Sequence, residues 1–230
     1  MICLLCQQIS QTPISITEII FLRRISSPIC QQCQKSFQKI GKSVCATCCA
    51  NSDIIACRDC LKWENKGYNV NHRSLYCYNA AMKAYFSQYK FQGDYLLRKV
   101  FAVELADVIT KYYKGYIPVP VPVSPGCFRE RQFNQVSAIL EAANVSYLSL
   151  FEKLDNTHQS SRTKKERLLV EKSYRLLKVS NIPDKILIVD DIYTTGSTII
   201  ALTTGSTIIA LRKQLAKVAN SDIKSLSIAR

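Results

Sequence analysis

Two adjacent carboxylates, Asp190 and Asp191, follow an apolar run and precede a loop of small residues. The run at 186–189 contains the β-branched side chains typical of a buried parallel strand. The loop at 194–198 offers hydroxyls, a glycine and backbone N–H groups where a helix is expected to begin, which suits a phosphate. Carboxylates at the carboxyl end of a strand can accept hydrogen bonds from vicinal sugar hydroxyls or share a cation with them. These residue types predict a sugar-phosphate site.

Two other interpretations of this stretch fit less well. A simple glycine turn with two solvated acids would not require the whole string of acids and hydroxyls. A nucleotide P-loop would require the G-x-x-x-x-G-K-[ST] spacing, which is missing, and the loop has no lysine after its glycine.

The string VDDIYTTGST, residues 189–198, resembles the signature of type I phosphoribosyltransferases, which bind phosphoribosyl diphosphate (PRPP). The resemblance implies that Asp190 and Asp191 are the catalytic acids that hold the ribose hydroxyls. It also implies that Mg²⁺ accompanies PRPP if the site is active. The residues implied around the 5-phosphate are Thr194, Thr195, Gly196, Ser197 and Thr198.

The segment TTGSTIIAL occurs twice in tandem, at 194–202 and at 203–211. Nine extra residues rotate the rest of a helix by about 900°, or two and a half turns. One straight helix through both copies would therefore turn the apolar residues after the repeat to the face opposite those of the first copy, and it could not bury both sets. We expect the first copy to form the phosphate loop, because it is contiguous with the acids, and the second to be looped out or badly accommodated. The alternative is that the second copy forms the loop and the first forms a bulge. Our hypothesis is that the repeat impairs the protein. The later apolar set lies at helical spacing: Ile208, Leu211, Leu215 and Val218.

Eight of the 11 cysteines form four C-x-x-C pairs within the first sixty residues. Two such pairs complete one tetrahedral all-cysteine zinc site, so eight ligands predict two structural sites with no position open for catalysis. Pairing in sequence order gives Cys3, Cys6, Cys30 and Cys33 at one site, and Cys45, Cys48, Cys57 and Cys60 at the other. Crossed pairing stays open. We expect a double zinc ribbon over 1–62, with Cys49, Cys77 and Cys127 as packed thiols.

The elements that must position these residues follow a linker at 63–73. We expect a domain over 74–230, and the phosphoribosyltransferase resemblance implies an α/β fold with a parallel sheet and helices on both faces. Prolines keep much of 117–123 out of a central strand position. The expected strands are 74–79, 117–123, 186–189 and 223–229, and the expected helices are 80–89, 94–113 with Asp94 as its N-cap, and 134–143.

Aromatic and basic side chains alternate between 83 and 99. Such a pattern suits single-stranded nucleic acid, in which each stacked base contributes about 1–3 kcal/mol, but aromatics at helical spacing more often form a core. Lys and Arg number 31 against 17 acids, a net charge of +14 that favours a polyanionic partner or, equally, a solvated basic surface. The aromatics are Tyr85, Phe86, Tyr89, Phe91 and Tyr95, and the cations are Lys83, Lys90, Arg98 and Lys99.

No apolar run approaches the roughly 18 residues of a membrane span, so we expect no transmembrane segment. The first residues, MICLLCQQ, lack the basic segment of a signal peptide. We therefore expect a cytoplasmic location, where reducing conditions favour metal binding by the cysteine pairs over disulfides.

A turn carrying Arg129 and Arg131 follows the proline-rich segment, and arginine forks suit a pyrophosphate. The strings PVPVSP and RERQFNQ, with the cysteine-rich head and VDDIYTTGST, resemble the ComF family over essentially the whole chain. The family fragment reads R-x-R-G-F-N-Q, and Gln132 here takes the glycine position. If that position requires a positive φ, Gln132 is strained. By resemblance, 157–167 is a flap near the ligand whose matching positions are Gln159, Glu166 and Arg167.

The ComF resemblance implies a competence protein that handles single-stranded DNA during natural transformation and binds PRPP. It also implies a ComFA-type helicase and other DNA-processing competence proteins as partners. The second hypothesis is a phosphoribosyltransferase of nucleotide salvage, although no residue identifies an acceptor. The third is a non-catalytic assembly module of the DNA-uptake machinery.

Overall fold

The computed structural model describes residues 2–9, 27–52, 56–65, 67–154, 173–178, 181–193 and 204–230, with side chains of the last segment from Thr207 onward. The helical elements are α2 (Gln31–Ser36), α3 (Arg58–Glu64), α4 (Ala80–Phe91), the 3₁₀ helix η1 (Tyr95–Lys99), α5 (Ala102–Tyr112), α6 (Pro125–Arg131), α7 (Gln135–Ala142) and α9 (Thr204–Ala216). Among these residues, none of the helices has the length and apolar character needed to cross a membrane.

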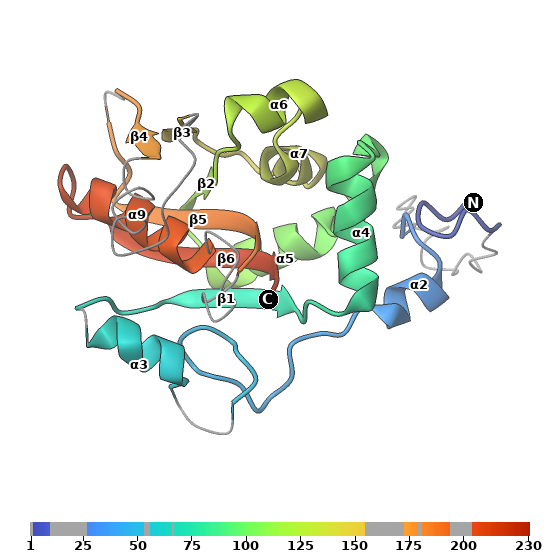
Figure 1. Cartoon of the computed structure of the whole chain (residues 1–230), viewed down its shortest axis with the longest axis horizontal. Coiled ribbons are helices and arrows are strands. Elements are labelled where there is room, and N and C mark those ends of the chain that lie inside the picture. Colours follow the sequence, from blue (N-terminus) through green and yellow to red (C-terminus); the bar gives the residue numbers. More distant parts are fainter. Residues whose placement is uncertain are drawn as a thin grey trace, which may run out of the picture.

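A four-stranded parallel sheet lies at the centre of the fold (Figure 1). Its strands are β1 (His72–Tyr76), β6 (Asp222–Ala229), β5 (Lys185–Ile192) and β2 (Ile117–Pro120), in that spatial order. The proline-containing β2 lies at an edge, because proline has no backbone N–H to donate to a neighbouring strand. Strands β3 (Phe151–Lys153) and β4 (Tyr174–Leu176) form a separate antiparallel pair.

Both faces of the sheet are covered, as the sequence predicts for this fold class. Alternate residues of a strand point to opposite faces. Leu187 and Val189 pack into a core with residues of α4, η1, α5 and α7, whereas Ile186 and Ile188 pack with α9 and the second group of cysteines. Figure 1 shows α9 and α5 on opposite sides of the sheet.

The expected long helix over 94–113 is wrong, because the segment divides into η1 and α5. The carbonyl of Leu97 accepts hydrogen bonds from the Val100 N–H at 3.0 Å and from the buried Tyr85 hydroxyl at 3.3 Å. This i+3 bonding closes a 3₁₀ turn instead of continuing an α-helix. Asp94 caps η1 by accepting from the Leu96 N–H.

The expected turn around Arg129 and Arg131 is instead the helix α6. Ser124 accepts from the Cys127 N–H at 3.2 Å, and Pro125 occupies the first helical position. A serine cap followed by proline is a common helix start, so the signal was present in the sequence.

The aromatic platform expected between 83 and 99 is mostly core. Tyr85, Phe86 and Tyr89 are buried, so they cannot stack on a base. Phe91 and Tyr95 stay exposed. Of the accompanying cations, Lys90 is largely buried.

The second copy of the repeat supplies most of α9, so the expectation that it is looped out is wrong from Thr204 onward. Ile208, Leu211 and Leu215 are buried on the expected face, whereas Val218, beyond the end of the helix, is 57% exposed. The first copy lies outside the described residues, so its expected role as the phosphate loop stays a prediction.

Candidate functional site

Asp190 and Asp191 occupy the carboxyl end of β5, between the neighbouring strands β6 and β2. Both side chains are buried. Each uses one carboxylate oxygen to accept a backbone N–H: Asp190 Oδ1 from Asp191 at 2.8 Å, and Asp191 Oδ1 from Ile192 at 2.7 Å. Asp190 Oδ2 has no hydrogen-bond partner among the described residues. Buried carboxylate oxygens held in this way are suited to a polyol or a cation.

The two acids differ in charge environment. Burial and the neighbouring Asp191 raise the pKa of Asp190 well above its usual value. Burial alone would raise the pKa of Asp191 too, but the Lys90 ammonium forms an ion pair with its Oδ2 and holds that pKa below its usual value. Burial therefore favours the neutral form of Asp190, whereas the Lys90 ammonium favours the charged form of Asp191.

The α6 segment is tied to the end of α4 that carries Lys90. Arg131 Nε donates to the Lys90 carbonyl at 2.9 Å, and Arg131 Nη1 donates to Gln135 Oε1 at 2.5 Å. Arg129 is exposed on the same short helix. Gln132 adopts the left-handed conformation with φ of 67°, so this position does have the positive φ that favours glycine.

A polar group that the sequence did not indicate lies on β1. His72 is buried, and its ring nitrogens lie 3.0 Å from the hydroxyls of Ser74, Ser225 and Ser227. Its ring stacks on Tyr193 with centroids 3.8 Å apart. Only the alternating polar positions of the two strands could have suggested this network.

The chain terminus links Tyr193 to the second group of cysteines. The Arg230 guanidinium lies 5.0 Å from the Tyr193 ring centroid and donates to the Cys48 carbonyl at 2.6 Å. Tyr193, which follows β5, therefore packs against the cysteine-rich head.

The eight cysteines form the two sequential groups expected, and no crossed pairing joins them in the parts of the chain that are described. Ligand sulfurs of a tetrahedral zinc–thiolate site lie roughly 3.8 Å apart. The observed sulfur–sulfur distances match this value: 3.8 Å for Cys6 and Cys30, 3.8 Å for Cys45 and Cys60, and 3.6 Å for Cys48 and Cys57.

Hydrogen-bond donors favour the thiolate form of one cysteine in each group. Burial opposes ionisation, but the N–H groups of Cys6 and Cys30 lower the pKa of the Cys3 thiol to about 6. Cys45 is likewise lowered to about 6, with the Thr47 hydroxyl and the Cys57 N–H outweighing burial. Both groups could therefore hold a structural zinc ion.

A cavity of about 280 Å³ opens between the segment before β1 and the helix α9. Its described lining includes Tyr68, Tyr193, Ile208 and Arg212, and neither Asp190 nor Asp191 contributes to it. The cavity adjoins the residue after β5 but is not the acid pair itself.

Several predicted site residues lie outside the described residues. They are Thr194, Thr195, Gly196, Ser197 and Thr198 of the expected phosphate loop and Gln159, Glu166 and Arg167 of the expected flap. Among the described candidates, the structure connects Arg131 to Lys90, and Lys90 to Asp191.

Comparison with known proteins finds relatives that match most of this chain. The chain is 40% identical to the competence protein ComFC of Streptococcus pneumoniae strain R6 over 228 residues, 99% of each chain. It is 32% identical to the competence protein ComFC of Bacillus subtilis strain 168 over 207 residues, covering 86% of this chain and 85% of the relative. No protein-family model matches the chain. The identity and coverage show that the chain belongs to the ComF family of competence proteins.

Proposed function

We propose that this protein acts in natural transformation by binding single-stranded DNA, and that it binds PRPP at the Asp190–Asp191 pair. The observation that carries the PRPP site is the buried acid pair at the carboxyl end of β5, in which one Asp190 oxygen has no hydrogen-bond partner in the part of the chain that the structure describes. In open parallel sheets, ligands bind at the carboxyl ends of the strands. The names of the relatives support the role in competence.

The donor set fits Mg²⁺ as well as ribose hydroxyls, because Asp190 presents an oxygen that has no hydrogen-bond partner among the described residues and Asp191 presents a second carboxylate beside it. When bound, Mg²⁺ would supply positive charge for the diphosphate of PRPP. Asp190 and Asp191 would hold the ribose side of the ligand. Arg131, fixed to the end of α4, would lie on the diphosphate side.

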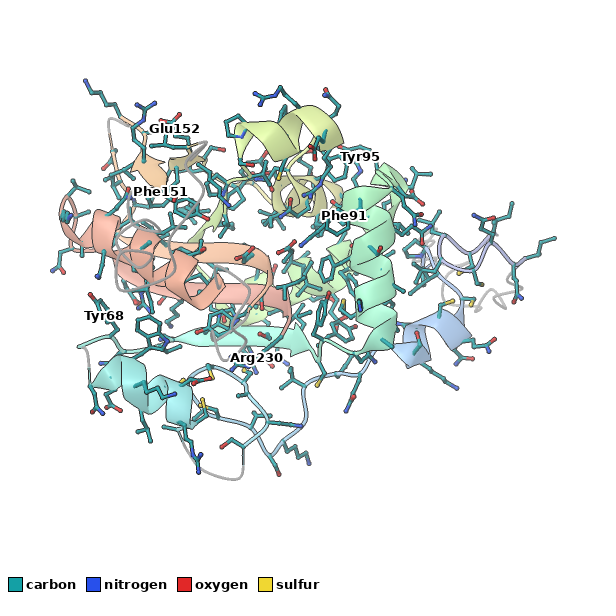
Figure 2. The ribbon with its side chains drawn as sticks, in the orientation of Figure 1. Tyr68, Phe91, Tyr95, Phe151, Glu152 and Arg230 are labelled. Atoms are coloured by element: carbon teal, nitrogen blue, oxygen red, sulfur yellow. The ribbon has the colours of Figure 1, made fainter. Side chains whose placement is uncertain are left out.

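The DNA-binding surface is proposed where exposed rings lie beside cations near α4, η1 and α6. Phe91 is 81% exposed and Phe128 is 48% exposed. Arg98 lies 4.1 Å from the centroid of the Tyr95 ring and donates to its hydroxyl. Figure 2 shows Phe91 and Tyr95 at the end of α4 nearest α6 and α7. Exposed rings of this kind accept stacked bases of any sequence, and the basic charge attracts the phosphates.

The test is binding of a fluorescent oligodeoxythymidine to the zinc-loaded protein, with and without Mg²⁺–PRPP, at several salt concentrations. We expect affinity to fall as salt rises, PRPP to change that affinity, and Asp190→Asn with Asp191→Asn to abolish the PRPP effect while DNA still binds. Phe91→Ala should weaken DNA binding without changing PRPP binding. An affinity that never responds to PRPP would refute a coupled site.

Release of pyrophosphate from PRPP in the presence of a nucleobase would instead support a salvage enzyme. Normal transformation by the double asparagine variant would support a non-catalytic assembly module. A ComFA-type helicase and other DNA-processing proteins stay predicted partners, to be tested by co-purification from competent cells.

A further inference from the structure

Lys90 lies in the last turn of α4, where its ammonium contacts Asp191 Oδ2. The Lys90 and Asp191 side chains are only 15% and 6% exposed. The ammonium also lies 4.7 Å from the centroid of the Phe86 ring. A desolvated lysine in such a place needs a negative partner, and Asp191 is the carboxylate that the structure provides.

The backbone of Lys90 is fixed at the same time to the arginine-bearing segment. Its carbonyl accepts from Arg131 Nε, and the neighbouring Tyr89 hydroxyl donates to the Gln135 carbonyl at 2.8 Å. This end of α4 is therefore anchored to α6 and α7, whereas the ammonium sits at the end of a flexible four-carbon side chain. Lys90 thus joins the acid side of the proposed site to its diphosphate side.

The positive charge of the Lys90 ammonium affects which ligands can bind at Asp191. A free divalent cation approaching Asp191 meets a positive ammonium already in contact with the carboxylate and is repelled by it. A cation that arrives on a sugar diphosphate brings negative phosphate oxygens, to which the ammonium can move. The same ammonium that disfavours the bare cation therefore favours the cation–diphosphate complex.

This inference rests on the PRPP site proposed above. We propose that Lys90 is a ligand-binding residue that pairs with Asp191 and moves its ammonium to the diphosphate when a cation-bound sugar diphosphate enters. Lys90 thereby makes the site select the complex over the free cation.

The test is isothermal titration of zinc-loaded wild type, Lys90→Met and Lys83→Met with Mg²⁺ alone and with Mg²⁺–PRPP. Lys83 is exposed on the same helix and provides the matched control. Removing one adjacent positive charge should strengthen binding of Mg²⁺ alone by about tenfold or more in Lys90→Met. It should weaken binding of Mg²⁺–PRPP by a similar factor, since a charged donor to the phosphates is lost. Lys83→Met should behave as wild type in both titrations.

A purely structural lysine would not produce opposite changes for the two probes. Because Lys90→Met leaves Asp191 buried without its partner, the double variant Lys90→Met, Asp191→Asn provides a folded comparison if the single variant unfolds. This double variant should also fail to prefer the complex over the free cation.

Failure of the wild type to bind Mg²⁺–PRPP would overturn the proposed function and this inference with it. Wild-type binding of Mg²⁺–PRPP, with both affinities unchanged in Lys90→Met, would overturn the role of Lys90 alone. If Lys90→Met does not fold, an unchanged preference for the complex in the double variant would likewise overturn it.

Discussion

Phe37→Ala should destabilise the whole protein, although Phe37 lies between the two cysteine groups and outside the sheet. Its side chain is 6% exposed, and its ring meets those of Tyr76, Tyr85 and Phe101 with centroids 6.1, 6.2 and 5.0 Å apart. Removing a buried phenyl group costs about 3–5 kcal/mol, including the cavity left behind. We expect a loss in that range for the free energy of unfolding.

Urea unfolding followed by two probes measures this loss. Fluorescence of Trp63, the single tryptophan, reports the cysteine-rich head, and far-ultraviolet circular dichroism reports the helices around the sheet. The matched control Phe91→Ala removes a ring that is 81% exposed and should change stability by no more than about 0.5 kcal/mol. A loss below about 1 kcal/mol for Phe37→Ala, or separate transitions for the two probes in the wild type, would refute a shared core. Separate transitions would instead favour an independent domain over 1–62.

Three further changes test other parts of the structure. Cys45→Ser should reduce bound zinc from two ions per chain to one, measured by plasma mass spectrometry, whereas Cys127→Ser, outside both groups, should retain two. Gln132→Gly should raise the free energy of unfolding in urea by roughly 0.5–1 kcal/mol by relieving the positive φ, and Gln132→Ala should give no such gain. Burial, with Arg230 nearby, holds the pKa of His72 well below 6.5, so the unfolded chain binds a proton there more readily than the folded one. The free energy of unfolding should therefore fall as the pH drops below 6.5, by up to about 1.4 kcal/mol per pH unit. His72→Gln should reduce that slope, measured by urea unfolding at several pH values.

Local patterns predicted the parts of the fold that depend on nearby residues. The apolar run before Asp190 is a central strand, 80–89 lies within α4, and the helix expected over 134–143 is α7, which begins after its cap Asn134. Cysteine spacing predicted the two groups of four cysteines, because two residues between a pair of cysteines let both sulfurs face one ion. The break between η1 and α5 could not be predicted in this way, since it depends on a hydrogen bond from the distant Tyr85 hydroxyl to Leu97.

The second copy of the repeat shows the same limit. Its sequence is identical to that of the first, so composition and spacing cannot distinguish them. In the second copy, Ile208 and Leu211 are buried in the same core as Ile186 and Ile188 of β5. The expectation that this copy is looped out was therefore wrong from Thr204 onward, because a helix there buries an apolar face.

Asp190 and Asp191 have identical side chains, but they lie on opposite faces of the sheet and have different neighbours. Neighbouring strand residues alternate between faces, so Asp191 lies on the side of α4 and Lys90, with Leu187 and Val189, whereas Asp190 follows Ile186 and Ile188 toward the side of α9. Lys90 therefore pairs with Asp191, whereas Asp190 Oδ2 has no hydrogen-bond partner among the described residues. A ligand that engages both acids must replace the ion pair at Asp191 but need only donate to Oδ2 at Asp190. The sequence shows the two acids, but the three-dimensional placement of a lysine from another element gives them different charge environments.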